Sequence, residues 1–439
     1  SVIFMFTLPL AIGNIFQQLY NMADTIIVGR FVGADALAAV GSTGTIMFLL
    51  NGFAQGITAG FSVLTAQRFG AGKKDAVKQS VTNGILLSII GAILLTVLGC
   101  AIMDPLLHLM NTPDDIFDMA YTYITLISLG MIANVFYNLF SSYLRAVGNS
   151  KAPLFFLVFS ACLNVGLDLF FIVVLKMGVA GAAWATNLSQ AISALLCIVY
   201  IYCKVPALVP EKKHWRLTAG DTRYQMQMGI PMALQFAITS SGTMIMQSAI
   251  NLFGSEAVAA YTAACKVHSL LTQGMVAMGQ TMAVYSGQNY GKGDYGRIRA
   301  GVKAALIIEF IYSVVSAVAV SLLLGVTLGL FFSGDVDLTA MMPWARTYIT
   351  ICTLFYIPLS TIFIFRNTMQ GCGYGFLPMM GGVVELVARM LVAMIAMRVH
   401  SYALSCFCDP AAWISAGLFT GVSYLFVMKK IKATLSPKG

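Results

Sequence analysis

Long apolar segments recur along almost the whole chain, and their length restricts the folds that are open to it. Residues 154–175, for example, read LFFLVFSACLNVGLDLFFIVVL and contain a single charged side chain. About 20 apolar residues suffice for a helix to cross the hydrocarbon of a bilayer, whereas membrane barrels need strands of alternating polarity. Continuous apolar runs of this length therefore predict helices that span a membrane, because a helix satisfies its own backbone groups.

Glycine, proline and charged residues separate twelve such segments. The expected spans are 3–32, 36–67, 79–103, 116–144, 153–175, 178–203, 224–253, 257–289, 298–332, 339–370, 377–399 and 403–428. Only 10% of the residues are charged, against about 25% in a soluble domain. We therefore predict an all-α polytopic membrane protein. The first residue already lies in an apolar run, so we expect a trimmed N-terminus, and no cleavable signal peptide is recognisable.

The distribution of charge orients these segments. Loops after even-numbered segments, together with the C-terminal tail, hold 19 of the 26 lysines and arginines, including Lys438. Loops after odd-numbered segments are acidic, with Asp114, Asp115, Asp118, Asp335 and Asp337. The positive-inside rule then places both termini in the cytoplasm, and we expect a plasma (inner) membrane location. The net charge of +9 is thus explained by topology, and no nucleic-acid partner is expected.

The sequence also repeats itself in two halves. GADALAA at 33–39 returns as GSEAVAA at 254–260, and QRFGAGK at 67–73 returns as QNYGKGD at 288–294. Six crossings per half give both halves the same orientation, with a central cavity expected between two pseudo-symmetric bundles. We expect an N-terminal six-helix bundle at 1–203, a cytoplasmic linker at 204–223, a C-terminal six-helix bundle at 224–430 and a cytoplasmic tail at 431–439.

Several motifs occur in an order that is typical of one transporter family. They are Pro9, Gln17, DTIIVG at 24–29, the Gly70/Gly72 loop, RAVGNSK at 145–151 followed by Pro153, and Asn164 followed by Asp168. Together they resemble the multidrug and toxic compound extrusion (MATE) family over essentially the whole chain. The resemblance implies twelve helices in two bundles, a V-shaped cavity, and export of bulky, often cationic drugs in exchange for Na+ or H+.

The positions of acidic residues in the membrane segments indicate which branch of the family the chain resembles. The NorM-like branch carries functional acids in the seventh and tenth helices, but segments 224–253 and 339–370 contain no acid. The DinF-like branch places its coupling site in the N-terminal bundle, and this chain keeps that set of residues. It resembles the DinF-like branch.

The depth of polar groups brings one set of residues together. An intramembrane carboxylate needs a partner, a cavity or a proton. At the helical rise, Asp24 lies about 12 Å from the outer end of the first segment, and Asp168 lies at a similar level in the fifth. Tyr123, Thr186 and, one turn deeper, Asn164 reach the same outer half of the N-terminal bundle.

The resemblance implies that these five residues form the cation- or proton-coupling site. Two carboxylates with amide and hydroxyl oxygens suit a hard monovalent cation or a shared proton. Asp24, Asp168 and Asn164 would be the Na+ ligands in a sodium-coupled protein, and no other cofactor is expected. A structural alternative is a buried polar cluster that satisfies itself through hydrogen bonds and locks the helices.

Further polar residues are candidates for lining the cavity or binding substrate: Gln17, Tyr20, Asn134, Asn138, Gln235, Glu385 and Arg389. Asn138 lies about 22 Å from Tyr123 along the helix axis, too far to share its ion site. A helix–helix amide contact is the alternative for Asn134 and Asn138. Glu385 and Arg389 lie one turn apart, which favours a neutralising ion pair over a role in substrate or proton handling.

A few other charged residues and prolines lie within the expected spans. Glu309 is expected to reach the cytoplasmic interface, and Lys266 and Arg366 are possible charge partners in the C-terminal bundle. Pro9 and Pro231 occupy equivalent repeat positions and are expected to kink the first helix of each half as hinges.

These residues bear on three classes of function: a drug antiporter, a lipid flippase and an enzyme. A drug antiporter that works as a monomer on small organic molecules within the lipid bilayer fits the acidic site. A flippase for lipid-linked saccharides shares the architecture and would use a basic cavity, for which Lys266, Arg366 and Arg389 are candidates. An enzyme is not expected, because the nine cysteines and four histidines form no metal or nucleophile–base grouping.

Overall fold

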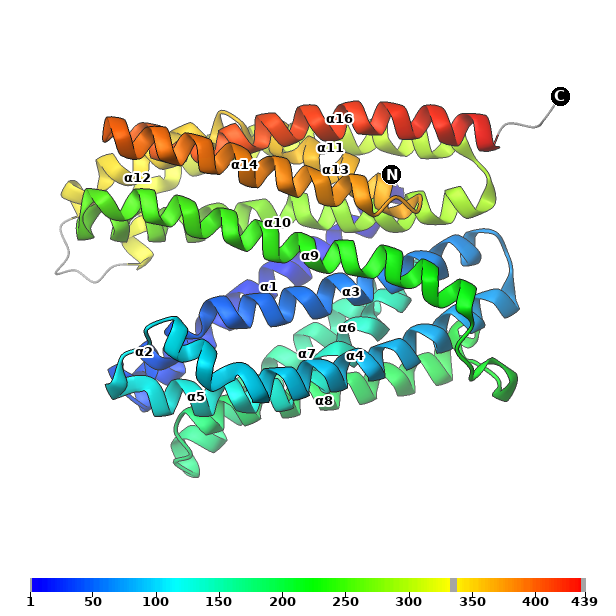
Figure 1. The fold of residues 1–439 in the computed structure, drawn as a ribbon, viewed down its shortest axis with the longest axis horizontal. Helices are drawn as coiled ribbons and strands as arrows, with labels where there is room; N and C mark the ends of the chain where they lie inside the picture. The colour runs from blue at the N-terminus through cyan, green and yellow to red at the C-terminus, as the bar shows by residue number, and fades with distance from the viewer. Residues whose placement is uncertain (1, 332–337, 436–439) are drawn as a thin grey trace. The chain divides into compact units, whose positions relative to one another are not determined.

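The computed structural model describes residues 2–331 and 338–435, and within these ranges it is helical, with no β-strand (Figure 1). Asp335, Asp337 and Lys438, which contributed to the expected topology, lie outside the described residues. The elements are α1 (Val2–Phe31), α2 (Ala34–Ser42), α3 (Gly44–Gly70), α4 (Lys74–Leu109), α5 (Asp114–Leu129), α6 (Met131–Ala146), α7 (Lys151–Asp168), η1 (Leu169–Val174), α8 (Val179–Lys204), η2 (Pro206–Leu208), η3 (Lys212–His214), α9 (Ala219–Ile250), η4 (Asn251–Phe253), α10 (Ser255–Lys292), α11 (Tyr295–Phe331), α12 (Leu338–Thr353), α13 (Tyr356–Gly371), α14 (Phe376–Val399), α15 (Tyr402–Cys406) and α16 (Cys408–Leu435).

The long helices agree with the expected membrane spans. Among the described residues, 8 helices are long and apolar enough to cross a membrane, and the count rises to 10 when two bent pairs are included. These pairs are α5 with α6, bent by 48°, and α12 with α13, bent by 50°. Helices α9 and α10, of 32 and 38 residues, coincide with the two other expected spans and contain more Gln, Ser and Thr. The predicted all-α membrane fold is confirmed.

The internal repeat is also present in the backbone. Gly33 and Gly254 have φ of 126° and 95°, Gly72 and Gly293 have 74° and 81°, and Gly148 and Gly373 have 89° and 93°. Only glycine adopts these positive values at little cost, so each half conserves its turns through a glycine at the matching position. The bends of the two broken helix pairs match as well.

Contacts divide the chain into two units. The N-terminal unit comprises Ile12–Phe236, and the C-terminal unit comprises Ala237–Gly439 together with Ser1–Ala11. Both α1 and α9 therefore begin in one unit and end in the other, and each changes unit within a few residues of its internal proline, Pro9 or Pro231. Each helix continues through its proline. The expected bundle limits at 203 and 224 and the proposed hinge roles stay predictions.

A stripe of glycines packs α3 against the first half of α9 within the N-terminal unit. A Cβ atom added at Gly60 would lie 2.4 Å from the Cα of Gly229, and one at Gly56 would lie 2.7 Å from the carbonyl oxygen of Met232. Gly52 continues the same face of α3 one turn earlier, against Phe236. Small residues at this spacing let membrane helices approach closely, so dispersion contacts hold α9 to the N-terminal unit.

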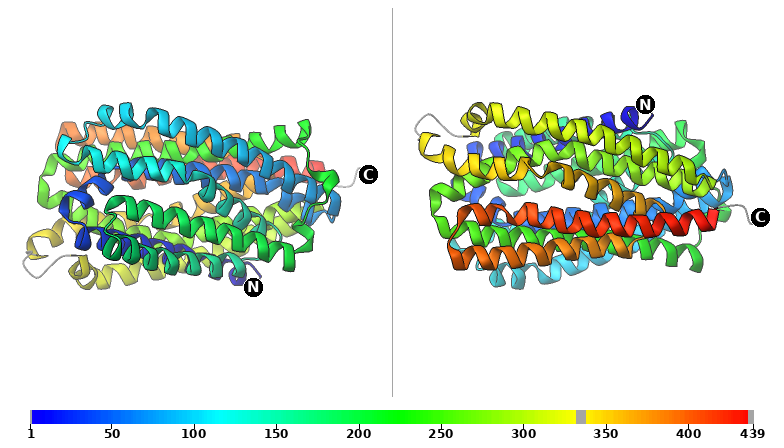
Figure 2. Two further views of the ribbon diagram at one scale, coloured as in Figure 1. Left: turned by 90° about the horizontal axis from the view of Figure 1, so that it is seen from below. Right: turned by 90° about the horizontal axis from the view of Figure 1, so that it is seen from above.

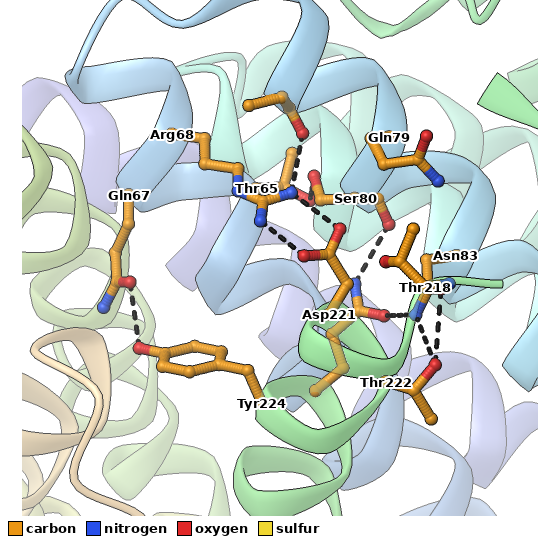
Figure 3. Close-up of polar contacts among 12 residues, drawn as sticks. Thr65, Gln67, Arg68, Gln79, Ser80, Asn83, Thr218, Asp221, Thr222 and Tyr224 are labelled. Atoms are coloured by element: carbon orange, nitrogen blue, oxygen red, sulfur yellow. Dashed lines mark hydrogen bonds and ion pairs between the residues drawn. The ribbon is translucent and has the colours of Figure 1, made fainter. Parts of the chain in front are cut away.

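Polar contacts fix the start of α9 to the same unit (Figure 3). The guanidinium of Arg68 donates to both carboxylate oxygens of Asp221, with an Nη1–Oδ2 distance of 2.8 Å. The amide of Asn83 donates to Gln225 Oε1 at 2.8 Å, and its Oδ1 accepts from the backbone of Thr218. The start of α9 is thus attached to α3 through charge-assisted hydrogen bonds and to α4 through the amide of Asn83.

The C-terminal unit has an aromatic core. In Figure 2, α16 runs beside α14, and both helices contribute to this core. Tyr348, Tyr356 and Trp413 are almost fully buried there, and the ring of His268 stacks on Trp413 with centroids 5.5 Å apart. His268 Nδ1 and the Tyr356 hydroxyl are 2.8 Å apart, so the buried imidazole has a hydrogen-bond partner.

Candidate acidic cation site

The five residues of the predicted coupling site lie in the N-terminal unit on four helices. Asp24 comes from α1, Tyr123 from α5, Asn164 and Asp168 from α7, and Thr186 from α8. The charges of Asp24 and Asp168 both act on the Tyr123 hydroxyl, and the two carboxylates lie close enough to share a hydrogen bond. The structure therefore brings together residues that are up to 162 positions apart in the sequence.

Tyr20 joins this group from one turn before Asp24. Its hydroxyl lies close to the carboxylates of Asp24 and Asp168 and to the hydroxyl of Tyr123. From the sequence, Tyr20 was expected only as a possible cavity-lining residue. Its i,i+4 spacing from Asp24 on α1 is the signal that links it to the acidic group.

The acceptor oxygens of this site exceed its donors. Asp168 is fully buried, and both of its carboxylate oxygens lack a hydrogen-bond donor, as do Oδ1 of Asp24 and Oδ1 of Asn164. Asn164 donates its Nδ2 to Thr186 Oγ1 at 3.4 Å, and that hydroxyl donates to the carbonyl of Ala182. Two ionised carboxylates cannot satisfy each other, since neither has a hydrogen to donate. A proton or a cation would satisfy these oxygens.

The chemistry of the donor set fits a small hard cation. Carboxylate, amide and hydroxyl oxygens are the ligands that hard ions prefer, whereas zinc and copper favour imidazole and thiolate. Within the described ranges no three His, Cys, Asp or Glu side chains come together as a metal-binding group. Asp24, Asn164 and Asp168 would be the principal ligands of such an ion, and Thr186 could add a hydroxyl oxygen.

The backbone changes its helical form immediately after Asp168. Helix α7 ends at this residue, and the chain continues as a six-residue π-helix, η1. Wider turns of this kind are frequent at functional sites. The apolar sequence LFFIVV of η1 gives no signal from which this could be predicted.

The predicted cavity residues Asn134 and Asn138 bond to other amides. Asn138 donates to the backbone carbonyl and to Oδ1 of Asn134, at 2.9 Å each, and Asn134 donates to Oδ1 of Asn51 at 3.1 Å. The bond between Asn134 and Asn51 joins α6 to α3, which is the helix–helix amide contact that was the alternative, whereas Asn138 bonds within α6. Gln17 and Gln235 are half-buried on α1 and α9.

A second buried cluster of charged residues lies in the C-terminal unit. Arg389 Nη1 is 3.6 Å from Glu385 Oε2, so the predicted ion pair is present. Arg366 Nη1 is 3.8 Å from Glu385 Oε1, and Arg389 Nε donates to Asp409 Oδ1 at 3.1 Å. Asp409 is absent from the predicted site residues, because it lies at the edge of an expected span with no base at helical spacing. Both arginines are neutralised here, and Lys266 is exposed, which weakens the basic cavity that a flippase would use.

One expectation about an intramembrane acid is wrong. Glu309 does not reach an interface: it is 3% exposed on α11, and its Oε2 is buried without a hydrogen-bond partner. Its side chain turns toward the packed face of α11 that also carries Ser313, since position 309 shares that face of the helix. Arg30, in contrast, is exposed.

Comparisons with known proteins agree with this architecture. The chain is 31% identical over 299 residues to the "Probable multidrug resistance protein YpnP" of Bacillus subtilis, a match spanning 67% of this chain and 66% of that protein. It is 25% identical to the "DNA damage-inducible protein F" of Escherichia coli, over 71% of this chain and 69% of that protein.

A solved structure described as the "Outward-facing conformation of a multidrug resistance MATE family transporter of the MOP superfamily" shares the fold. It has a TM-score of 0.89 at 23% identity, covering 99% of this chain and 96% of that one. The family model described as MatE matches residues 9–170 and 231–395, one segment in each half of the repeat. Since these segments cover well over half of its residues, the chain belongs to the MatE family of multidrug transporters.

Proposed function

We propose that the protein is a secondary antiporter that exports bulky organic compounds, often cationic, in exchange for Na+ or H+. The observation that carries the proposal is the set of four buried acceptor oxygens of Asp24, Asn164 and Asp168 that lack a donor. A buried carboxylate pair without a counter-charge is costly in hydrocarbon, so the site gains strongly from binding a cation or proton. That gain is the differential binding energy that an ion gradient can use to shift a conformational equilibrium.

Helix α1 offers a physical route for this coupling. It carries Asp24 in its second half, within the N-terminal unit, while Pro9 lies in the part that groups with the C-terminal unit. A proline in a helix interior removes a backbone hydrogen bond and makes bending easier. Loading of the acidic site would then alter the position of α1 and favour release of the exported compound.

The excess of basic residues in loops after even-numbered segments supports a plasma-membrane protein with both termini in the cytoplasm. In that orientation the acidic site faces the outer half of the bilayer, and the ion enters from outside. The protein works as a monomer in this proposal.

The test is exchange in proteoliposomes that contain the purified protein and a fluorescent organic cation such as ethidium. A sodium gradient and a pH gradient are imposed separately, each with an ionophore control. We expect one of the gradients to drive ethidium efflux and its collapse to stop it. Efflux that ignores both gradients would refute ion-coupled antiport, and movement of a lipid-linked saccharide in the same vesicles would favour a flippase.

A further inference from the structure

The two units carry corresponding positions that can be aligned from the helix limits. The first and last residues of α13 are each 225 positions after those of α6. The same offset relates residues 151–174, which form α7 and η1, to residues 376–399, which form α14. At this offset Asn164 corresponds to Arg389 and Tyr123 to Tyr348. The buried residues of α5 and α12 share the same offset, since Ile116, Ala120 and Ile124 match Met341, Ala345 and Ile349. The motif GAAW at 181–184 returns as PAAW at 410–413, which makes α16 the counterpart of α8.

The corresponding residues form a polar cluster in the C-terminal unit, as they do in the N-terminal unit. Tyr348 on α12 donates to Asp409 Oδ2 at 3.3 Å, and Asp409 on α16 accepts from Arg389 of α14. Counterpart helices thus supply a tyrosine and a polar group at the Asn164 position to each cluster. The carboxylates differ in position, since Asp409 and Glu385 correspond to Ala180 and Ser160, and Asp168 corresponds to Ala393. The tyrosine and the Asn164/Arg389 position therefore follow the repeat, and each unit places its carboxylates at positions of its own.

The clusters differ in charge. Arg366, Arg389, Glu385 and Asp409 carry two positive and two negative charges, and their side chains are 13% exposed or less. In the N-terminal unit the amide of Asn164 stands where the guanidinium of Arg389 stands in the C-terminal unit, and among the described residues no basic side chain forms an ion pair with Asp24 or Asp168. A guanidinium does not lose its charge in a protein, so Arg389 is a permanent cation at this position.

We propose that Arg389 is the tethered cation of a second, latent cation site formed by Asp409, Glu385 and Tyr348. Its guanidinium occupies the place that a free alkali cation would otherwise take. On this account only the N-terminal unit exchanges its ion with solution, which fixes the coupling to one site per chain. The statement about coupling rests on the proposed function of the Asp24/Asp168 site. The existence of the latent site does not depend on that function.

A purely structural ion pair makes a different prediction when the arginine is removed. Loss of Arg389 leaves the cluster with one uncompensated negative charge, which destabilises a buried site in either case. If the position is a cation site, a small free cation of suitable size can replace the lost charge. If the pair only packs the helices, no specific cation restores stability.

The experiment uses the purified full chain with Arg389→Met, which keeps side-chain length but removes the charge. Binding of 22Na+ and the thermal unfolding midpoint are measured in sodium chloride and in choline chloride at equal ionic strength. All variants are also made in an Asp168→Asn background, so that the N-terminal site contributes nothing. We expect the Asp168→Asn/Arg389→Met chain to bind 22Na+ saturably and to be stabilised by sodium, whereas Asp168→Asn alone is not.

Two further variants keep the result interpretable. Arg389→Lys retains a tethered cation and should not gain sodium binding, while adding Asp409→Asn to Arg389→Met should abolish the gain. Arg389→Gln serves in place of Arg389→Met if that chain does not fold. Equal sodium responses with and without Arg389 in folded protein would overturn the proposal. An unchanged ion response on Asp168→Asn in the chain that retains Arg389 would instead refute the proposed N-terminal site.

Discussion

The carboxylates of Asp24 and Asp168 lie within hydrogen-bonding reach of each other, yet neither can donate while both are ionised. Both oxygens of Asp168 and one of Asp24 are buried without another donor. The pair therefore has two states of very different energy, one bare and one loaded with a proton or a cation. A transporter that must respond to an ion needs a site of this kind, because the energetic difference drives the change of conformation.

A nearly isosteric substitution at Thr186 tests whether its hydroxyl contributes to ion binding. Thr186→Val keeps the shape of the side chain but removes the oxygen that accepts from Asn164. We expect the ion concentration for half-maximal transport to rise about tenfold, which corresponds to ~1.4 kcal/mol. The measurement is ethidium efflux against ion concentration in proteoliposomes. Thr186→Ser keeps the hydroxyl and should behave like the parent chain; identical curves for Val and Ser would exclude Thr186 as a ligand or positioning group.

The ion pair between Arg68 and Asp221 should stabilise the attachment of α9. Its side chains are 23% and 11% exposed, and the guanidinium donates to both carboxylate oxygens. We expect Arg68→Met to lower the free energy of unfolding by about 2 kcal/mol, as charge-assisted hydrogen bonds of partly buried groups do.

The matched control is Lys213→Met, which removes ion pairs whose members are 59% to 77% exposed. Such pairs contribute about 0–1 kcal/mol. Thermal unfolding in detergent would compare the two variants. A loss from Lys213→Met as large as that from Arg68→Met would show that the Arg68 contact has no special role.

Close packing at Gly60 predicts that an alanine there destabilises the protein, whereas an alanine at an unpacked helix glycine does not. Gly60→Ala would place a Cβ 2.4 Å from the Cα of Gly229, so α3 and α9 would have to separate. We expect a loss of stability of about 2 kcal/mol. Gly91→Ala in α4 is the control, because a Cβ there has nothing within 4 Å and alanine favours the helix by about 0.5 kcal/mol. The unfolding midpoints should move in opposite directions; a shared direction would contradict the packing described.

Pro9 is expected to act in export rather than in folding. Pro9→Ala restores the backbone hydrogen bond that proline lacks and stiffens α1, which carries Asp24. Drug resistance in cells should fall while the amount of protein in the membrane stays the same. Pro105→Ala, in the interior of α4, is the control and should leave resistance unchanged. Full drug resistance in cells that carry Pro9→Ala would show that Pro9 is not a hinge needed for export.

The fold could largely be predicted from the sequence, because each level of it leaves a local signal. Apolar runs locate the spans, glycines such as Gly72 and Gly293 mark equivalent turns, and the repeat relates the halves. Membership of the MatE family confirms the prediction of a transporter rather than an enzyme. The division of α1 and α9 between two units has no local signal, since it depends on which distant helices contact each half.

The candidate site could be predicted in part, for the same physical reason. Asp24 and Asp168 are conspicuous because charge inside an apolar run is costly, and helical rise gives their depth. Asp409 could not be found in this way, because its partner Arg389 lies on another helix and only folding brings them together. Glu309 was misplaced because spacing along a helix does not give the face that neighbouring helices cover.

The most direct test of the account compares two buried carboxylates in reconstituted protein. Asp168→Asn removes the charge from the acidic site, whereas Glu309→Gln makes the same change at a buried acid of the C-terminal unit. Ethidium efflux driven by an imposed Na+ or pH gradient is measured at equal amounts of folded protein. The account predicts that Asp168→Asn abolishes gradient-driven efflux and that Glu309→Gln preserves it. Efflux by Asp168→Asn at the rate of the parent chain would contradict the claim that this site couples transport to an ion.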